Sequence, residues 1–321
     1  MPAATEVTLF GLSDVGLVRQ RNEDVLLAKS LRSEEVLPNG LVHRCPADSS
    51  AIVLGVFDGM GGAASGHVAS GMAADVMGRL GRDGQPGATA DLLETLGRGA
   101  LQANREILGR SRRDASCAGM GTTLTVGAIL DGRLHFVHVG DSRGYLLRRG
   151  QLVQFTSDQS LSQLLGTRDQ AAGTGYPHVI LQAVGVGDLL EPTAGRVTLR
   201  RGDLLLLCTD GLTDHLTHAE IETAIVAHAQ DLGRVARALV ETAKARGGHD
   251  NISVLLALVE GESLPEAASE DDAPAVERVE LRVLRTARQR MRRRQWLLVV
   301  AAAVLMAGMA GAIILLGRSR R

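Results

Sequence analysis

The sequence predicts an α+β fold in which antiparallel sheets carry helices on their outer faces. Apolar runs of strand length are bounded by turn residues, and several follow one another closely. Asp131-Gly132, between two such runs, is a signal for a tight hairpin. Helical stretches occur in pairs instead of alternating with strands, which disfavours a doubly wound parallel sheet.

Each expected element follows from the local pattern. Alternating or continuous apolar runs between turns predict strands at residues 25–28, 51–57, 122–130, 134–139, 144–147, 204–208 and 252–259. Longer periodic stretches predict helices near residues 63–80, 89–108, 218–229 and 232–246. These elements are expected to form one globular unit over residues 5–261.

Composition excludes some function classes. The chain has a net charge of −1, and residues 1–261 are mildly acidic, which argues against nucleic acid as the main partner. Aromatic residues make up only 2% of the chain, so stacking platforms for single-stranded nucleic acid are not expected. The three cysteines have no metal-binding or disulfide spacing, and we expect them to be reduced.

The C-terminal part differs from the body. Residues 262–281 are expected to be an acidic flexible linker, 282–295 a basic juxtamembrane segment, 296–317 a transmembrane helix and 318–321 a short basic tail. Twenty consecutive residues, 297–316, carry no charge and follow Trp296. More arginines precede this span than follow it. We therefore expect a single-pass anchor in the bacterial cytoplasmic membrane, in contact with lipid, with the globular unit in the cytoplasm.

Four widely separated aspartates stand beside a glycine or asparagine at expected strand ends. They occur in Asp58-Gly59, Gly140-Asp141, Asp210-Gly211 and Asp250-Asn251. Carboxylates that converge in a cleft repel one another unless cations lie between them. Oxygen ligands without cysteine or paired histidine favour Mg²⁺ or Mn²⁺ over Zn²⁺. The pattern therefore indicates a metal-dependent hydrolase that acts on a phosphate-bearing substrate.

An N-terminal segment adds charged candidates. Arg19 is followed by Glu23 and Asp24, and a guanidinium near a metal site offers a planar fork for phosphate oxygens. Taken alone, this segment is equally compatible with a solvated charge run. The glycines after Asp58 are not followed by Gly-Lys-Ser/Thr, which disfavours a P-loop NTPase.

The ordered set of motifs is more specific than its parts. RQRNED, which begins at Arg19, is followed in order by FDGMGG, GTT, GDSR, TDGLTD and GGHDN over about 230 residues. This order closely resembles the bacterial form of the PP2C (PPM) family of metal-dependent protein serine/threonine phosphatases, across nearly all of residues 5–260. The resemblance implies a four-layer α-β-β-α sandwich of two antiparallel sheets flanked by helix pairs.

The resemblance also implies roles for individual residues. Asp58 would bridge two Mn²⁺ or Mg²⁺ ions, and the Gly59 carbonyl would bind one of them. Asp210 and Asp250 would complete the shell of the other ion. Arg19 would bind the substrate phosphate. A hydroxide that bridges the two ions would attack phosphorus in line, without a phosphoenzyme.

Further acidic residues are expected to act less directly. Glu23 and Asp24 match family positions that act mainly through metal-bound water. Asp141, with Asp210 and Asp214, resembles a third and weaker metal site of bacterial members. Two ions, with a third possible, are therefore expected.

The sequence departs from the family pattern at three places. Many eukaryotic members have histidine where Met60 stands, and methionine cannot protonate the leaving oxygen, so a metal-bound water is the expected acid. Gln159 stands where relatives usually have histidine. Residues 166–177 correspond to the mobile segment over the site and are short and glycine-rich.

The expected function is hydrolysis of phosphoserine and phosphothreonine in proteins, which would reverse a Ser/Thr protein kinase at the membrane. Two alternatives stay open. The domain could be a catalytically weak phosphoprotein-binding scaffold, which the intact Asp58, Asp210 and Asp250 disfavour. It could also act on partner-switching regulators such as anti-sigma-factor antagonists.

Overall fold

The structure is a computed structural model of the 321-residue chain. It describes residues 5–31, 40, 42–46, 51–61, 65–80, 92–165, 179–267 and 272–284. The chain divides into two compact units, Met1–Glu280 and Leu281–Arg321. The first unit contains every helix and strand discussed below.

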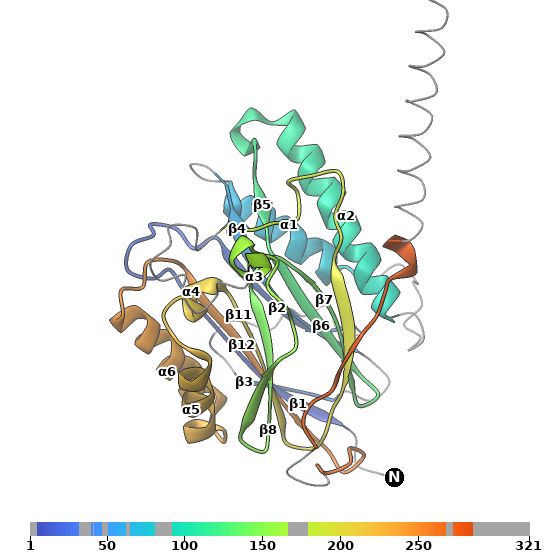
Figure 1. The fold of residues 1–321 in the computed structure, drawn as a ribbon, viewed down its shortest axis with the longest axis vertical. Helices are drawn as coiled ribbons and strands as arrows, with labels where there is room; N and C mark the ends of the chain where they lie inside the picture. Colours follow the sequence, from blue (N-terminus) through green and yellow to red (C-terminus); the bar gives the residue numbers. More distant parts are fainter. Residues whose placement is uncertain are drawn as a thin grey trace, which may run out of the picture. The chain divides into compact units, whose positions relative to one another are not determined.

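Two antiparallel sheets form the centre of the first unit (Figure 1). Sheet 1 has the strand order β3-β1-β12-β11-β8-β9, and sheet 2 has the order β13-β10-β7-β6-β4-β2, with β5 paired to β4. The strands of sheet 1 are β1 (Glu6–Asp14), β3 (Val42–Pro46), β8 (Arg143–Arg148), β9 (Gln151–Gln154), β11 (Asp203–Cys208) and β12 (Ile252–Glu260). The strands of sheet 2 are β2 (Asp24–Ser30), β4 (Ile52–Met60), β5 (Gly121–Thr122), β6 (Leu124–Leu130), β7 (Arg133–Val139), β10 (Thr193–Thr198) and β13 (Val276–Arg278).

Helix pairs cover the outer faces of both sheets. Helices α1 (Gly66–Gly78) and α2 (Leu92–Arg113) contact strands of sheet 2, whereas α5 (His218–His228) and α6 (Leu232–Ala245) contact sheet 1 (Figure 1). Thr217 and Asp231 cap the N-termini of α5 and α6 by accepting hydrogen bonds from backbone N–H groups. The described residues of the unit also contain three short helices, η2 (Ala115–Cys117), α3 (Leu161–Leu165) and α4 (Asp210–Thr213).

Alternate residues of one strand contribute to two different apolar layers, one on each face of the sheet. In β11, Leu205 and Leu207 belong to a core that joins residues of both sheets. Leu204 and Leu206, one position removed, belong to a core shared with α5 and α6. Successive side chains of a strand point to opposite faces, so a continuous leucine run is what a strand covered on both faces requires.

The expected α+β sandwich is confirmed. All the expected strands and helices exist, and the Asp131-Gly132 hairpin joins β6 to β7 with both residues at positive φ, 47° and 67°. Five strands, β1, β3, β9, β10 and β13, were not expected. Three of them are edge strands (β3, β9 and β13), whose partly exposed sequences carry weaker apolar patterns.

The acidic segment after β12 is not a free linker where the structure describes it. Strand β13 pairs with β10, and Asp272 forms ion pairs with Arg148 and Arg200. The part of the expected linker that the structure describes thus includes a paired strand and an ion-paired aspartate. Composition alone does not reveal these contacts, because Arg148 and Arg200 lie far from Asp272 in the chain.

The expected transmembrane anchor falls on residues that the structure does not describe. Among the residues that the structure describes, no helix is both long and apolar enough to span a membrane. The uncharged stretch 297–316 lies outside those residues and stays a prediction from the sequence.

A buried ion pair gives a test of this packing. The Arg148 guanidinium donates to both oxygens of Asp203 at 2.9 and 2.7 Å, and both side chains are at most 5% exposed. Removing Asp203 leaves the buried Arg148 charge with only the longer ion pair to Asp272, at 3.6 Å. We expect Asp203→Ala to lower the free energy of unfolding by about 3–5 kcal/mol in urea denaturation.

The matched control is Asp188→Ala. Asp188 also pairs with an arginine, Arg112, but its side chain is 71% exposed. Its loss should change the unfolding free energy by less than about 1 kcal/mol. Equal effects of the two substitutions would contradict the buried ion pair.

Candidate metal and phosphate site

Two aspartates face each other on neighbouring strands. Asp24 begins β2 and is the register partner of Asp58 on β4. Like charges directly opposite each other in a sheet are destabilising, so this pair is unfavourable unless a proton or a cation offsets it. Burial, followed by the charges of Asp210 and Asp24, holds the pKa of Asp58 well above its usual range.

Asp24 also joins the two sheets. Its Oδ2 atom accepts hydrogen bonds from the hydroxyls of Thr209, after β11, and Ser253, in β12, at 2.9 and 2.7 Å. These bonds favour the charged carboxylate, but burial outweighs them and raises the pKa of Asp24 to about 7. The strand ends of both sheets therefore meet at this carboxylate.

Asp141 and Asp210 complete the acidic cluster. Asp210 follows β11 and begins α4, where its carboxyl lies within hydrogen-bonding reach of Asp58. Asp141 lies between β7 and β8, and burial together with the charges of Asp210 and Asp158 raises its pKa to about 8. Asp214, at the C-terminus of α4, is exposed and lies near enough to contribute to the same shift.

Arg19 supplies a cation at the edge of the cluster. Its Nη2 atom donates to Asp250 Oδ2 at 2.7 Å, and its side chain is 51% exposed. The hydrogen bond to Asp250 raises the pKa of Arg19, and the charges of Glu23 and Asp58 add to this effect. A half-exposed guanidinium beside a carboxylate cluster is suited to bind an anion that arrives from solvent.

Asn251 holds the loop that carries Arg19. Its Oδ1 atom accepts from the backbone N–H of Glu23 at 2.8 Å, and its Nδ2 atom donates to the carbonyls of Val15 and Arg21, both at 3.0 Å. One buried side chain thus fixes both ends of the loop between β1 and β2. No role for Asn251 could be predicted from the sequence, because these partners lie more than 225 residues away in the chain.

Two glycines allow β4 and α1 to approach closely. A Cβ atom on Gly59 would lie 2.3 Å from the Gly66 carbonyl oxygen, and one on Gly66 would lie 2.8 Å from Glu23 Oε2. Glu23 also accepts a hydrogen bond from Ser70 of α1 at its backbone carbonyl. Glycine at both positions thus brings the Glu23 carboxylate next to Asp58-Gly59.

The donor set fits hard divalent cations. Among the described residues, no three His, Cys, Asp or Glu side chains are already gathered in the geometry of a metal site. However, Asp24 Oδ1 and Asp141 Oδ1 are buried and accept no hydrogen bond from the described protein atoms. Buried acceptors without donors, in a cluster of carboxylates, are satisfied by cations that take oxygen ligands.

The structure brings most of the expected site residues together. Electrostatic interactions link four of them, Asp24, Asp58, Asp141 and Asp210. The Arg19–Asp250 ion pair lies beside these four. Glu23 and Gly59 adjoin this cluster, and Asp214 lies at its exposed edge. Their roles toward metal and phosphate stay predictions.

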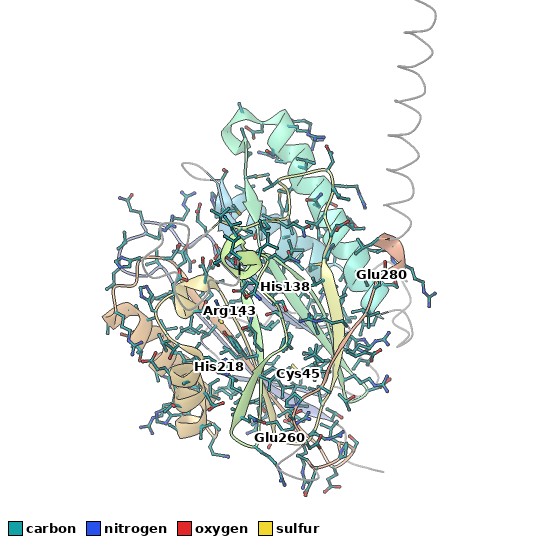
Figure 2. The ribbon with its side chains drawn as sticks, viewed as in Figure 1. Cys45, His138, Arg143, His218, Glu260 and Glu280 are labelled. Atoms are coloured by element: carbon teal, nitrogen blue, oxygen red, sulfur yellow. The ribbon has the colours of Figure 1, made fainter. Side chains whose placement is uncertain are left out.

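Two further polar residues support the site and were not expected. Thr123 Oγ1 accepts from the Asp58 backbone N–H at 2.9 Å. Asp158 binds Arg143 at 3.0 Å and lies near Asp141 (Arg143 is labelled in Figure 2). Their motifs, GTT and TSD, were visible in the sequence, but no spacing rule assigns such residues a partner.

Comparison with known proteins agrees with this geometry. The sequence profile of the Protein phosphatase 2C family matches residues 42–256. The chain is 36% identical over 250 residues to the serine/threonine protein phosphatase PstP of Mycobacterium tuberculosis, a match that covers 76% of this chain and 43% of PstP. It is 35% identical over 250 residues to the serine/threonine phosphatase stp of Listeria monocytogenes, which covers 76% of this chain and 92% of stp.

A solved structure extends the comparison. The catalytic domain of PstP in complex with two manganese ions matches with a TM-score of 0.65 and 34% identity, over 80% of this chain and 99% of that domain. The chain belongs to the protein phosphatase 2C family, whose members use Mn²⁺ or Mg²⁺. The chain spans less than half the length of PstP itself.

The raised carboxyl pKa values predict how stability depends on pH. A folded-state pKa of about 7 for Asp24 and about 8 for Asp141 lies above the unfolded value, so these groups stabilise the fold while protonated. That contribution is fully present below the unfolded pKa of 3.8, and it falls as pH rises from there to the folded-state pKa values of about 7 and 8. Burial lowers the pKa values of His135 and His138 to about 4. These two histidines therefore make the fold more stable as pH rises, but only between about pH 4 and 6.5.

We therefore expect the protein in EDTA to lose stability between pH 6.5 and 8, by about 1–2 kcal/mol or 2–4 °C in melting temperature. Mn²⁺ should reverse the loss at pH 8 because it replaces the missing protons. Asp24→Asn should reduce both effects in calorimetric melting curves, whereas the exposed control Asp75→Asn should change neither. Identical pH profiles for Asp24→Asn and the wild type would contradict the buried cluster.

Proposed function

We propose that the protein is a metal-dependent phosphatase that hydrolyses phosphoserine and phosphothreonine in other proteins. The observation that carries the proposal is the carboxylate cluster beside Arg19, in which burial and the charges of neighbours such as Asp210 raise the pKa values of Asp24, Asp58 and Asp141. The named relatives support it, since PstP and stp are serine/threonine phosphatases.

Arg19 is the residue suited to hold the substrate. Its side chain is half exposed and uses one nitrogen for Asp250, which leaves N–H groups for phosphate oxygens. Asp250 fixes the direction of the guanidinium, and Asn251 fixes the loop that carries it. The phosphate would thus be bound at the edge of the carboxylate cluster, on the side that solvent reaches.

The carboxylates would hold the metal ions. Two Mn²⁺ or Mg²⁺ ions would be held by Asp58, Asp210 and Asp250 together with the Gly59 carbonyl. A third ion would be held in part by Asp141 and Asp214. When bound, such ions supply a bridging hydroxide as the nucleophile and neutralise charge on the phosphoryl group. Asp58 and Asp210 are only partly buried, so a phosphorylated side chain can approach them from solvent.

The physiological setting is part of the same proposal. A protein phosphatase requires phosphorylated protein substrates and therefore a Ser/Thr protein kinase that makes them. A silent phosphoprotein-binding scaffold is disfavoured, because the acidic cluster raises the free energy of the folded protein and would be a liability without a cation to bind. Phosphoproteomics of a deletion strain separates general substrates from partner-switching regulators.

The activity test uses the bridging carboxylate and its neighbour. With Mn²⁺, the wild type should hydrolyse p-nitrophenyl phosphate and phosphothreonine peptides. Asp58→Asn and Asp210→Asn should lower kcat/KM by at least about 100-fold, because each removes charge that the ions require.

Asp188→Asn is the matched control, since Asp188 is exposed and pairs with Arg112. It should keep wild-type activity. The proposed function is wrong if the wild type fails to act on any phosphopeptide with Mn²⁺ or Mg²⁺, or if Mn²⁺-loaded Asp58→Asn is as active as the wild type.

We further propose that residues 297–316 anchor the protein in the cytoplasmic membrane with the phosphatase unit in the cytoplasm. Support comes from the uncharged span, from Trp296 at its start and from the excess of arginine before it. Tethering would concentrate the enzyme near membrane-bound kinases and their substrates.

Cell fractionation tests the anchor. The full chain should sediment with membranes, resist high salt and be released by detergent. Leu305→Arg with Met309→Arg, each costing about 3 kcal/mol at the centre of a span, should move the protein to the soluble fraction. Ser319→Arg, after the span, should not. A wild-type protein that stays soluble would contradict the anchor.

A further inference from the structure

The turn that carries Asp141 is held between two side chains. Gly140 has a φ of 103°, and a Cβ atom there would lie 2.7 Å from the Thr123 side chain. Thr123 in turn accepts from the Asp58 backbone N–H and bonds the Ser142 hydroxyl at 2.8 Å. One side of the turn is therefore packed against the residue that supports Asp58.

Gln159 binds the same glycine at two points. The Gly140 backbone N–H donates to Gln159 Oε1 at 3.0 Å, and the Gln159 backbone N–H donates to the Gly140 carbonyl at 2.7 Å. A single residue thus satisfies both backbone groups of Gly140. Because Asp141 follows directly, this contact determines where the Asp141 carboxylate lies.

The segment Ser157–Gln159 is itself well anchored. His138 Nε2–H donates to the Ser157 carbonyl at 3.2 Å, and Asp158 accepts from Arg143 at 3.0 Å (His138 and Arg143 are labelled in Figure 2). The Leu181 backbone N–H donates to the Gln159 carbonyl at 2.7 Å. Gln159 is therefore a fixed support and not a side chain that happens to touch the turn.

We propose that Gln159 is a positioning residue that holds Asp141 in place to bind a divalent cation. The proposal rests on the proposed function and adds a residue to it. Asp141 is 8% exposed, and its Oδ1 atom accepts no hydrogen bond from the described protein atoms, so its orientation is not set by its own contacts at that oxygen. The backbone of Gly140 supplies that orientation, and Gln159 holds the backbone.

To bind the Gly140 N–H, the side chain at position 159 must end in a hydrogen-bond acceptor where Gln159 Oε1 now lies. Leucine has a similar size but no acceptor, so Gln159→Leu leaves the buried Gly140 N–H without its partner. Glutamate keeps an acceptor oxygen at the same distance from the backbone. Gln163 lies nearby on α3 and is exposed, so Gln163→Leu makes the same chemical change away from Gly140.

The experiment is a calorimetric titration of the full chain with Mn²⁺ alone, in detergent, for the wild type and the three variants. Gln159→Leu should weaken the lowest-affinity ion about 3- to 10-fold and leave the tighter ions unchanged. Gln159→Glu should bind that ion at least as tightly as the wild type, and Gln163→Leu should match the wild type. Melting temperatures in EDTA are measured in parallel.

The outcomes separate this inference from the proposed function. A wild type that binds no Mn²⁺ would overturn both. A wild type that binds, with Gln159→Leu binding identically, would overturn the positioning role alone. Weaker binding of every ion together with a lower melting temperature in EDTA would also overturn it, because Gln159 would then act only on folding.

Discussion

The main constraint on this structure is the mutual repulsion of several carboxylates, which the strand ends of two sheets bring together. Asp24 and Asp58 are cross-strand partners, and Asp141 and Asp210 arrive from the turns after β7 and β11. Burial and neighbouring charge, including that of Asp210, raise the pKa values of Asp24, Asp58 and Asp141, so these three must bind a proton or share a cation. A fold that keeps such a cluster sacrifices stability for a site that divalent ions complete.

The rest of the sandwich holds this cluster in register. The hydroxyls of Thr209, just after β11, and of Ser253, in β12 of sheet 1, donate to Asp24 in sheet 2, so the carboxylate also connects the sheets. Strand β13 extends the support beyond the region that matches the family. Its Arg278 donates to the Ser157 hydroxyl at 3.0 Å, next to the residues that hold Asp141. The described part of the acidic segment up to Glu280 thus belongs to the first compact unit.

Much of this architecture could be predicted from the sequence, because buried strands and their turns leave local signals. The leucine run 204–207 and the Asp131-Gly132 hairpin are examples. The convergence of Asp58 and Asp210 followed from ordered motifs. The bonds from Thr209 and Ser253 to Asp24, and the ion pairs of Asp272, could not be predicted. They depend on which distant segments pack together, and neither composition nor periodicity records that.

Anomalous diffraction from crystals grown with Mn²⁺ would show whether the carboxylates bind the ions. We expect at least two manganese peaks within about 2.5 Å of carboxylate oxygens, with Asp58 between them and Asp210 and Asp250 around one of them. For Asp250, this requires that the oxygen now bonded to Arg19, or its neighbour, turns to the ion. A map with no manganese peak among these carboxylates would show that the cluster is not a metal site.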